Sequence, residues 1–163
     1  MTAQCTEFLH FQGETLSLCT NPLGDYLEAA GSPLKFYSTS TACWRGYVGT
    51  WAIEGGRLYL VKLNGCVRTA SGIADVNLAS LFPDYPDGVF AHWFTGQLRC
   101  PKGALLKYVH GGYSSSYEQD LLIDVQRGVV VQERLVVNGA AEPGAKPGYA
   151  MAGFTLFGRD QDV

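Results

Sequence analysis

Apolar residues in this chain come in short runs separated by glycine, proline and small polar residues, a pattern typical of antiparallel strands joined by turns. The clearest case is the segment 45–63, in which two β-rich runs flank the pair Gly55-Gly56, a common two-residue hairpin turn. Closing the turn there predicts a ladder in which Glu54 lies opposite Arg57, Ile53 opposite Leu58, Ala52 opposite Tyr59, Trp51 opposite Leu60, Thr50 opposite Val61, and Val48 opposite Leu63. Nearly all of these pairs are apolar, so we expect this hairpin to lie inside a sheet that is covered on both faces.

Further strands are predicted on both sides of this hairpin. Residues 8–11 and 15–19 form an opening hairpin around the turn 12–14. Strand patterns also occur at 34–37, 89–98, 104–110 and 149–157, with turn chemistry at 83–88 and 100–103.

The run 117–137 predicts a second long hairpin, and two loops compete for its turn. A three-residue loop at 126–128 pairs Val125 with Val129 and keeps the apolar face continuous. A two-residue loop at Arg127-Gly128 instead places Ile123 opposite Gln132. The apolar pairing favours the longer loop.

One amphipathic helix is predicted at about residues 22–30. Asn21 suits the N-cap and Pro22 the first helical position, while Gly31 and Pro33 end the segment. The apolar positions Leu23, Tyr26, Leu27 and Ala30 fall on one stripe. A short helical turn capped by Asp75 is expected to run to Leu81.

Composition agrees with this pattern and defines the fold class. The chain has 163 residues, 47% of them hydrophobic and 17% charged, with 20 glycines and 12% aromatic residues. We predict a mostly β (β-rich α+β) single domain over residues 1–163, whose antiparallel sheet curls into a partly closed barrel or sandwich with the helix packed on it. Residues 138–148 are expected to form an exposed loop and residues 158–163 a flexible tail.

Charge and the N-terminal segment exclude several classes of protein. The formal net charge is −3 and the basic residues are scattered, which argues against a partner that is a nucleic acid or an anionic membrane. The first residues lack a secretory signal and no apolar run is long enough to cross a membrane, so we expect a cytoplasmic protein.

The five cysteines do not follow a metal or redox motif. Their number is odd, no two have C-x-x-C spacing, and none lies within four residues of a histidine. Buried free thiols are the favoured interpretation, and no metal site or cofactor is predicted.

A histidine and two carboxylates are the candidates for catalysis. His110 precedes a glycine- and serine-rich loop, with Glu118 and Asp120 just beyond it. Such a trio can hold a proton-transfer site, since histidine titrates near neutral pH. The alternative is that the histidine is solvated or structural.

An arginine among aromatic residues is the candidate for ligand binding. An arginine beside aromatic rings can bind a carboxylate or stack on a base or sugar. The candidate residues are Trp44, Arg45, Tyr47, Trp51, Trp93 and Tyr113. In the alternative interpretation the aromatic residues fill the core and Arg45 forms an ion pair at a sheet edge.

Several motifs between residues 8 and 130 together resemble a family of small uncharacterised bacterial proteins. They are Phe11-Gln12-Gly13-Glu14, Asn21-Pro22-Leu23-x-x-Tyr26, the run from Thr41 to Ile53, Leu58-Tyr59-Leu60, Leu81-Phe82-Pro83, the run from Phe90 to Gly96, Leu98-Arg99-x-Pro101-x-Gly103, and the run from Tyr108 to Glu118. The resemblance implies a single bacterial cytoplasmic domain and carries no activity. The tripeptide Gly49-Thr50-Trp51 is also similar to a short motif of lipocalin-like barrels.

Two functions follow from these residues. We favour a non-catalytic binding module whose partner is a protein, such as a toxin that it neutralises, or a small ligand in the mouth of the sheet. The alternative is a small enzyme that uses His110, Glu118 and Asp120, with Arg45 as an anion anchor. Exposed strand edges also allow a homodimer.

Overall fold

The computed structural model describes residues 3–31, 35–109 and 111–140. The candidate residue His110, the predicted strand at 149–157, the predicted tail at 158–163 and most of the predicted loop at 138–148 lie outside the described residues.

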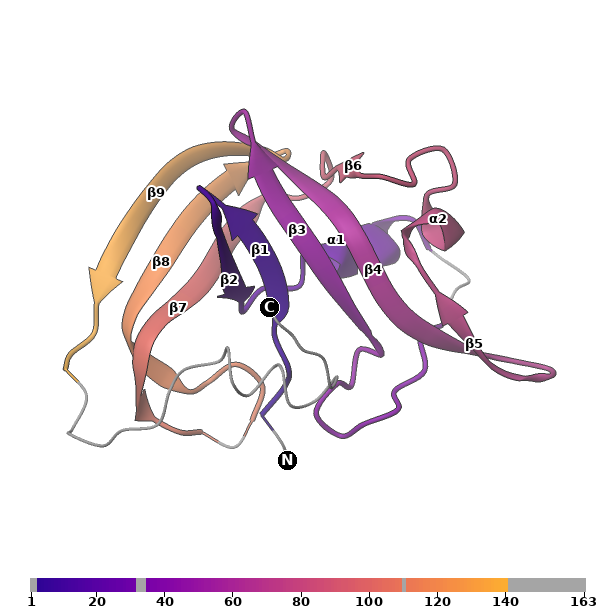
Figure 1. Ribbon diagram of the computed structural model, residues 1–163, viewed down its shortest axis with the longest axis horizontal. Coiled ribbons are helices and arrows are strands. Elements are labelled where there is room, and N and C mark those ends of the chain that lie inside the picture. Colours follow the sequence, from indigo (N-terminus) through magenta and orange to yellow (C-terminus); the bar gives the residue numbers. More distant parts are fainter. Residues whose placement is uncertain (1–2, 32–34, 110, 141–163) are drawn as a thin grey trace.

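The described chain forms one strongly curved sheet with two short helices (Figure 1). The strands are β1 (Glu7–Phe11), β2 (Glu14–Leu18), β3 (Tyr47–Glu54), β4 (Arg57–Thr69), β5 (Gly72–Val76), β6 (Val89–Phe90), β7 (Gly96–Lys107), β8 (Ser116–Gln126) and β9 (Val129–Val137), and the helices are α1 (Pro22–Ala29) and α2 (Leu78–Leu81). The strand order is β2-β1-β3-β4-β9-β8-β7, and β5 and β6 both pair with β4. The predicted mostly β single domain is confirmed, and the sheet is not closed into a barrel.

The two ends of the strand order meet where β2 leads into α1. The Cys19 N–H donates to the carbonyl oxygen of Arg99 on β7 (2.8 Å), and the Arg99 N–H donates to Thr20 Oγ1 (3.1 Å). The sheet is antiparallel except that β1 pairs with β3 in parallel, with Phe8 opposite Thr50 and Leu9 opposite Trp51. This curvature gives the sheet an inner face that can enclose a core.

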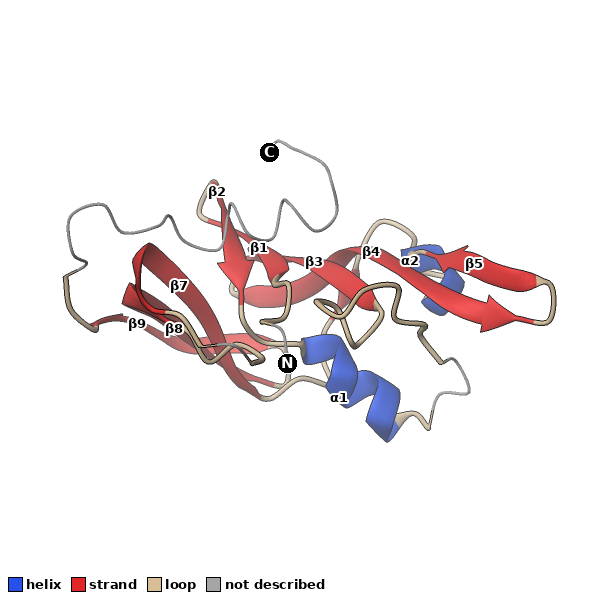
Figure 2. Ribbon diagram, turned by 90° about the horizontal axis from the view of Figure 1, so that it is seen from below, coloured by secondary structure: helices blue, strands red, loops and turns tan. Residues whose placement is uncertain are grey.

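The core lies on that inner face and α1 covers part of it (Figure 2). Fully buried side chains come from strands β1, β3, β4, β7 and β8, among them Leu9, Trp51, Leu58, Leu98 and Ile123. The predicted helix is confirmed and buries Leu23 against the core. Asn21 is its N-cap residue, but the Asn21 side chain makes no hydrogen bond to the helix.

The predicted register of the β3–β4 hairpin is confirmed near the turn and wrong farther from it. Thr50 lies opposite Lys62 instead of Val61, and Val48 opposite Asn64 instead of Leu63. Val61 is an extra residue that forms a β-bulge, so that Leu58, Leu60 and Leu63 share the core face, with exposed fractions of 0 to 1%. The register is therefore set by the burial of Leu63 in the core. A strict alternation of apolar and polar residues does not predict the bulge that this burial requires.

The favoured three-residue loop in the β8–β9 hairpin is wrong. Gln126 lies opposite Val129, so the turn has two residues, Arg127 and Gly128, with φ of 48° and 83°. Two positive φ values match the right-handed twist of the flanking strands. A bulge at Val131 then places Ile123 opposite Glu133.

The predicted strand at 89–98 is interrupted, and the predicted turn at 100–103 is strand. The segment 91–95 turns so that the Phe94 carbonyl accepts from the Gly128 N–H (2.8 Å), which ties it to the β8–β9 turn. Pro101 lies inside β7. The backbone N–H and carbonyl of Arg99, two residues earlier, bond Thr20 and Cys19 on the side away from β8, so the Pro101 nitrogen faces that side and its missing N–H removes no bond to β8.

The short second helix begins later than predicted. Asp75 belongs to β5 and lies opposite Cys66. Asn77 is the N-cap of α2, and Asn77 and Ser80 exchange hydrogen bonds in a capping box.

We expect Arg127→Asn to stabilise the protein by about 0.5–1 kcal/mol, because a left-handed backbone strains an ordinary side chain and asparagine tolerates it. Urea unfolding measures the change. The matched control is Gln126→Asn, at a neighbouring position without positive φ, where we expect a change below about 0.5 kcal/mol. An equal effect of the two substitutions would contradict the two-residue turn.

Candidate functional site

A fully buried carboxylate, Glu7, lies at the start of β1. Its Oε1 accepts a hydrogen bond from Trp51 Nε1 (2.8 Å). Its Oε2 accepts from the Gly49 N–H (2.8 Å) and from Arg45 Nε (3.1 Å), and Arg45 Nη2 lies 3.0 Å away. Burial raises the pKa of Glu7, and these three donors oppose that rise. Glu7 therefore joins the N-terminal strand, the loop before β3, and β3 itself.

The parallel pairing of β1 with β3 brings Glu7 beside Gly49. A Cβ atom on Gly49 would lie 2.7 Å from Glu7 Oε1 and 2.8 Å from Trp51 Nε1. Only glycine leaves room for the carboxylate and the indole there. The Gly-x-Trp motif thus supplies one donor from its backbone and one from its side chain.

Arg45 extends this network to Tyr113. Arg45 Nη1 donates to the carbonyl oxygen of Cys5 (3.0 Å). The Tyr113 hydroxyl lies 2.6 Å from Asn21 Oδ1 and 3.2 Å from the same Cys5 oxygen. Burial raises the pKa of Tyr113, so its hydroxyl keeps its proton. The Asn21 side chain is used here, which explains why it does not cap α1.

The structure brings together four of the predicted ligand-binding residues, Arg45, Tyr47, Trp51 and Tyr113, and Trp51 shares the Glu7 carboxylate with Arg45. Arg45 lies with its guanidinium carbon 5.6 Å from the centroid of the Tyr47 ring, and Arg45 and Tyr113 both donate to the carbonyl oxygen of Cys5. The Arg45 side chain is 11% exposed, and its guanidinium faces the Glu7 carboxylate. The guanidinium of Arg45 therefore binds the Glu7 carboxylate of the same chain.

Trp44 and Trp93 lie elsewhere. Trp44 is half exposed, and its backbone N–H donates to Gln4 Oε1 (2.7 Å). Trp93 stacks on Phe82 with ring centroids 5.8 Å apart, contacts Tyr26, and donates from Nε1 to the carbonyl oxygen of Pro22 (2.9 Å). Trp93 thus fixes α1 against the sheet.

The two candidate carboxylates on β8 make contacts within the protein. Glu118 Oε1 accepts from the Ala104 N–H (2.8 Å), and Asp120 Oδ1 accepts from Arg99 Nε (2.9 Å). Because His110 lies outside the described residues, its approach to them stays a prediction. Within the described part of the chain, no three or more His, Cys, Asp or Glu side chains are grouped so that they could hold a metal ion.

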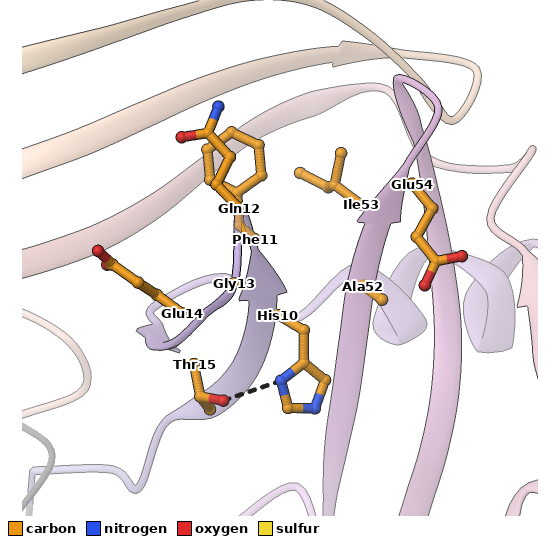
Figure 3. Close-up of a pocket in the computed structure, with 9 residues that line it drawn as sticks. All are labelled: His10, Phe11, Gln12, Gly13, Glu14, Thr15, Ala52, Ile53 and Glu54. Carbon is orange, nitrogen blue, oxygen red and sulfur yellow. Dashed lines mark hydrogen bonds between the residues drawn. The ribbon is translucent and has the colours of Figure 1, made fainter.

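The described surface includes two open hollows near these residues. The first, of about 330 Å³, lies beside the β1–β2 turn, where His10 Nδ1 and Thr15 Oγ1 are 2.9 Å apart (Figure 3). The second, of about 390 Å³, lies between the loop before β3 and the β4–β5 hairpin, and Cys43 is among its lining residues.

All five cysteines are free, and four of them are buried, as the sequence predicted; Cys66 is partly exposed. Cys5 and Cys43 lie together beside Arg45, with Val48, in a small buried cluster. Sequence analysis missed Glu7, Cys5 and Cys43. The Gly49-x-Trp51 motif was the available signal, since both of its donors bind Glu7.

No family model, curated protein or solved structure matches this chain. The described helices are all too short to span a membrane. The case for a function therefore depends on the residues themselves.

We expect Glu7→Gln to destabilise the protein by about 3–5 kcal/mol, because it leaves the buried Arg45 guanidinium without a counter-charge. The double variant Glu7→Gln/Arg45→Met should lose less than the sum of the single variants. Urea unfolding provides the double-mutant cycle. As a control, Glu14→Gln removes an exposed carboxylate 3.7 Å from Lys102 and should cost at most about 1 kcal/mol. Additive losses would show that Glu7 and Arg45 are not coupled.

Gly49→Ala should destabilise the protein by about 1–3 kcal/mol, because the added methyl group displaces the carboxylate or the indole. Thermal unfolding measures the loss. The control is Gly24→Ala in α1, where the nearest atom to a new Cβ is Tyr47 Oη at 3.8 Å. That change should be neutral or stabilising by up to about 1 kcal/mol, since alanine favours helix. Equal losses would argue against a steric requirement at position 49.

Proposed function

We propose that this protein is a non-catalytic binding module of the bacterial cytoplasm that binds a protein partner through strand β9. The observation that carries the proposal is the apolar exposure of this strand. Its exposed residues are Val129 (41%), Val131 (58%), Leu135 (51%), Val136 (36%) and Val137 (68%). Several exposed apolar side chains on one strand are typical of a surface that another protein covers.

One backbone edge of β9 is also free over most of its length. β9 pairs with β8 along the strand, but with β4 only where Val129 lies opposite Arg57. Beyond this point β9 and β4 diverge (Figure 1). Among the described residues, no other strand pairs with that edge. A free edge with apolar side chains suits the addition of an extended segment as a new strand.

The side chains of β9 specify what such a segment should contain. Leu135 and Val137 lie on the face that carries buried Ile123, whereas Val136 lies on the opposite face. Glu133 and Arg134 fall in the middle of the strand, on opposite faces. The complementary partner strand has apolar ends, with a basic residue opposite Glu133 and an acidic residue opposite Arg134.

The polar candidates support binding more than catalysis. The Arg45 guanidinium is neutralised by Glu7, and Asp120 is paired with Arg99. The Glu118 carboxylate accepts a backbone hydrogen bond. Charged groups used in this way stabilise the fold and have less capacity to act on a substrate.

The test compares Leu135→Lys with Ile73→Lys, a matched control because Ile73 is equally exposed (52%) and lies on β5, away from β9. A partner captured from the source cell by the unchanged protein is purified, and its affinity for each variant is measured by calorimetry. We expect Leu135→Lys to weaken binding at least tenfold, because it places a charge in the contact, and Ile73→Lys to leave it unchanged.

Hydrogen exchange and light scattering complete the test. The partner should protect the amides of residues 131–137 from exchange. If the partner is a second copy, the mass of the 17.7 kDa chain should double, and Leu135→Lys should return it to a monomer. Protection that excludes β9, or unchanged binding by Leu135→Lys, would contradict the proposal.

A further inference from the structure

The backbone of β9 directs alternate residues toward β8 and away from it. The Asn138 N–H, directly after the strand, donates to the Glu118 carbonyl oxygen on β8 (2.7 Å). The pairing of β9 with β8 is regular beyond its bulge, so every second residue before Asn138 faces β8 in the same way. The N–H and carbonyl groups of Glu133, Leu135 and Val137 therefore point away from β8, at the outward edge of β9.

This outward edge is covered only at the beginning of the strand. The Val130 N–H donates to the carbonyl oxygen of Gly56 (2.8 Å). Beyond this point strand β6 lies beside β4, with Phe90 opposite Tyr59, and β9 leaves β4. The side chains of residues 131–137 are all exposed, and in the described part of the chain no strand pairs with the outward edge there. An extended segment that paired with this edge would satisfy its backbone groups and cover apolar side chains.

The chain that follows β9 contains an apolar segment within reach of the outward edge. The described residues end at Ala140. Seven of the nine residues in 149–157 (Tyr-Ala-Met-Ala-Gly-Phe-Thr-Leu-Phe) are apolar, and the sequence predicts a strand there. The connection 138–148 extends to at most about 36 Å, whereas the exposed stretch 131–137 is about 20 Å long. The segment can therefore reach all of the exposed stretch.

The tether favours this segment over a second copy of the chain as the occupant of the edge. A segment on a short connection has an effective concentration on the order of millimolar, which a separate copy reaches only in concentrated solution. A second copy also brings its own Glu133 and Arg134. A symmetric pair of β9 strands centred on either residue places like charges opposite one another, which is unfavourable.

We propose that residues 149–157 pair with the outward edge of β9 as an antiparallel strand and occupy it until a partner displaces them. The inference rests on the proposed function, because it concerns the same edge. The segment has no charged residue, so it leaves Glu133 and Arg134 unmatched. The partner strand inferred above matches both charges and can replace the segment, but the competition lowers its apparent affinity.

The first experiment measures the hydrogen exchange of single β9 amides by NMR, in the full chain without a partner. We expect the outward amides of Glu133, Leu135 and Val137 to be protected, as are the amides of Arg134 and Val136, which face β8. Partner binding should add to this protection. Outward amides that exchange freely while those of Arg134 and Val136 stay protected would overturn the proposal, and this result needs no variant.

A substitution in the segment tests its role directly. Phe154→Asp places a charge in the apolar segment and should speed exchange of the outward amides at least about tenfold, while the amides of Arg134 and Val136 keep their rates. Ala145→Asp is the matched control, because it adds the same charge in the connection, and it should change neither set. Equal effects of the two substitutions on the outward amides would overturn the proposal.

Light scattering identifies the source of the protection. A mass of 17.7 kDa under the conditions of the exchange experiment assigns the protection to the same chain. A doubled mass would assign it to a second copy and would overturn the proposal.

The affinity for the partner separates this inference from the proposed function. Phe154→Asp should bind the captured partner at least about tenfold more tightly than the unchanged protein, because no segment has to be displaced. Equal affinities together with unprotected outward amides would overturn the inference and leave the proposed function intact. Protected outward amides together with unchanged partner binding by Leu135→Lys would support the pairing and contradict the proposed function alone.

Discussion

The ion pair of Glu7 with Arg45 is the interaction on which this end of the fold depends. A buried carboxylate loses its hydrogen bonds to water, and donors from the protein must replace them. Glu7 accepts from three such donors, which are a guanidinium, an indole and a backbone N–H. These donors come from the loop before β3 and from β3, whereas Glu7 comes from β1. The burial of the Glu7 carboxylate thus depends both on the parallel pairing of β1 with β3 and on the path of the loop before β3.

The same guanidinium connects the network to the two thiols. Arg45 contacts the carbonyl oxygen of Cys5, and its charge favours a thiolate on Cys43. The positive charge of Arg45 therefore lies beside both a buried carboxylate and a buried thiol. A structural ion pair can in this way set the chemistry of its neighbours without binding a substrate.

The proposed binding surface lies at the other side of the sheet and has a different physical origin. A sheet that curves without closing leaves an edge, and here the edge falls where β9 leaves β4 after one paired residue. The bulge at Val131 shifts the register there, so that Leu135 and Val137 lie on the core face but beyond the core. The proposed binding surface and the buried ion pair therefore lie in separate parts of the molecule.

The sequence by itself determined the features that depend on interactions between residues close together in the chain. Glycine pairs and apolar alternation predict the β3–β4 hairpin and its first four pairs, Pro22 and the apolar stripe predict α1, and composition predicts a mostly β domain. The tertiary structure decided what depends on contacts between distant segments. The bulge at Val61 exists because Leu60 and Leu63 both pack in the core, and Glu7 is charged and buried because Arg45, Gly49 and Trp51 surround it. No local pattern predicts such features, because the energy of a buried charge or a shifted register depends on groups far away in the chain.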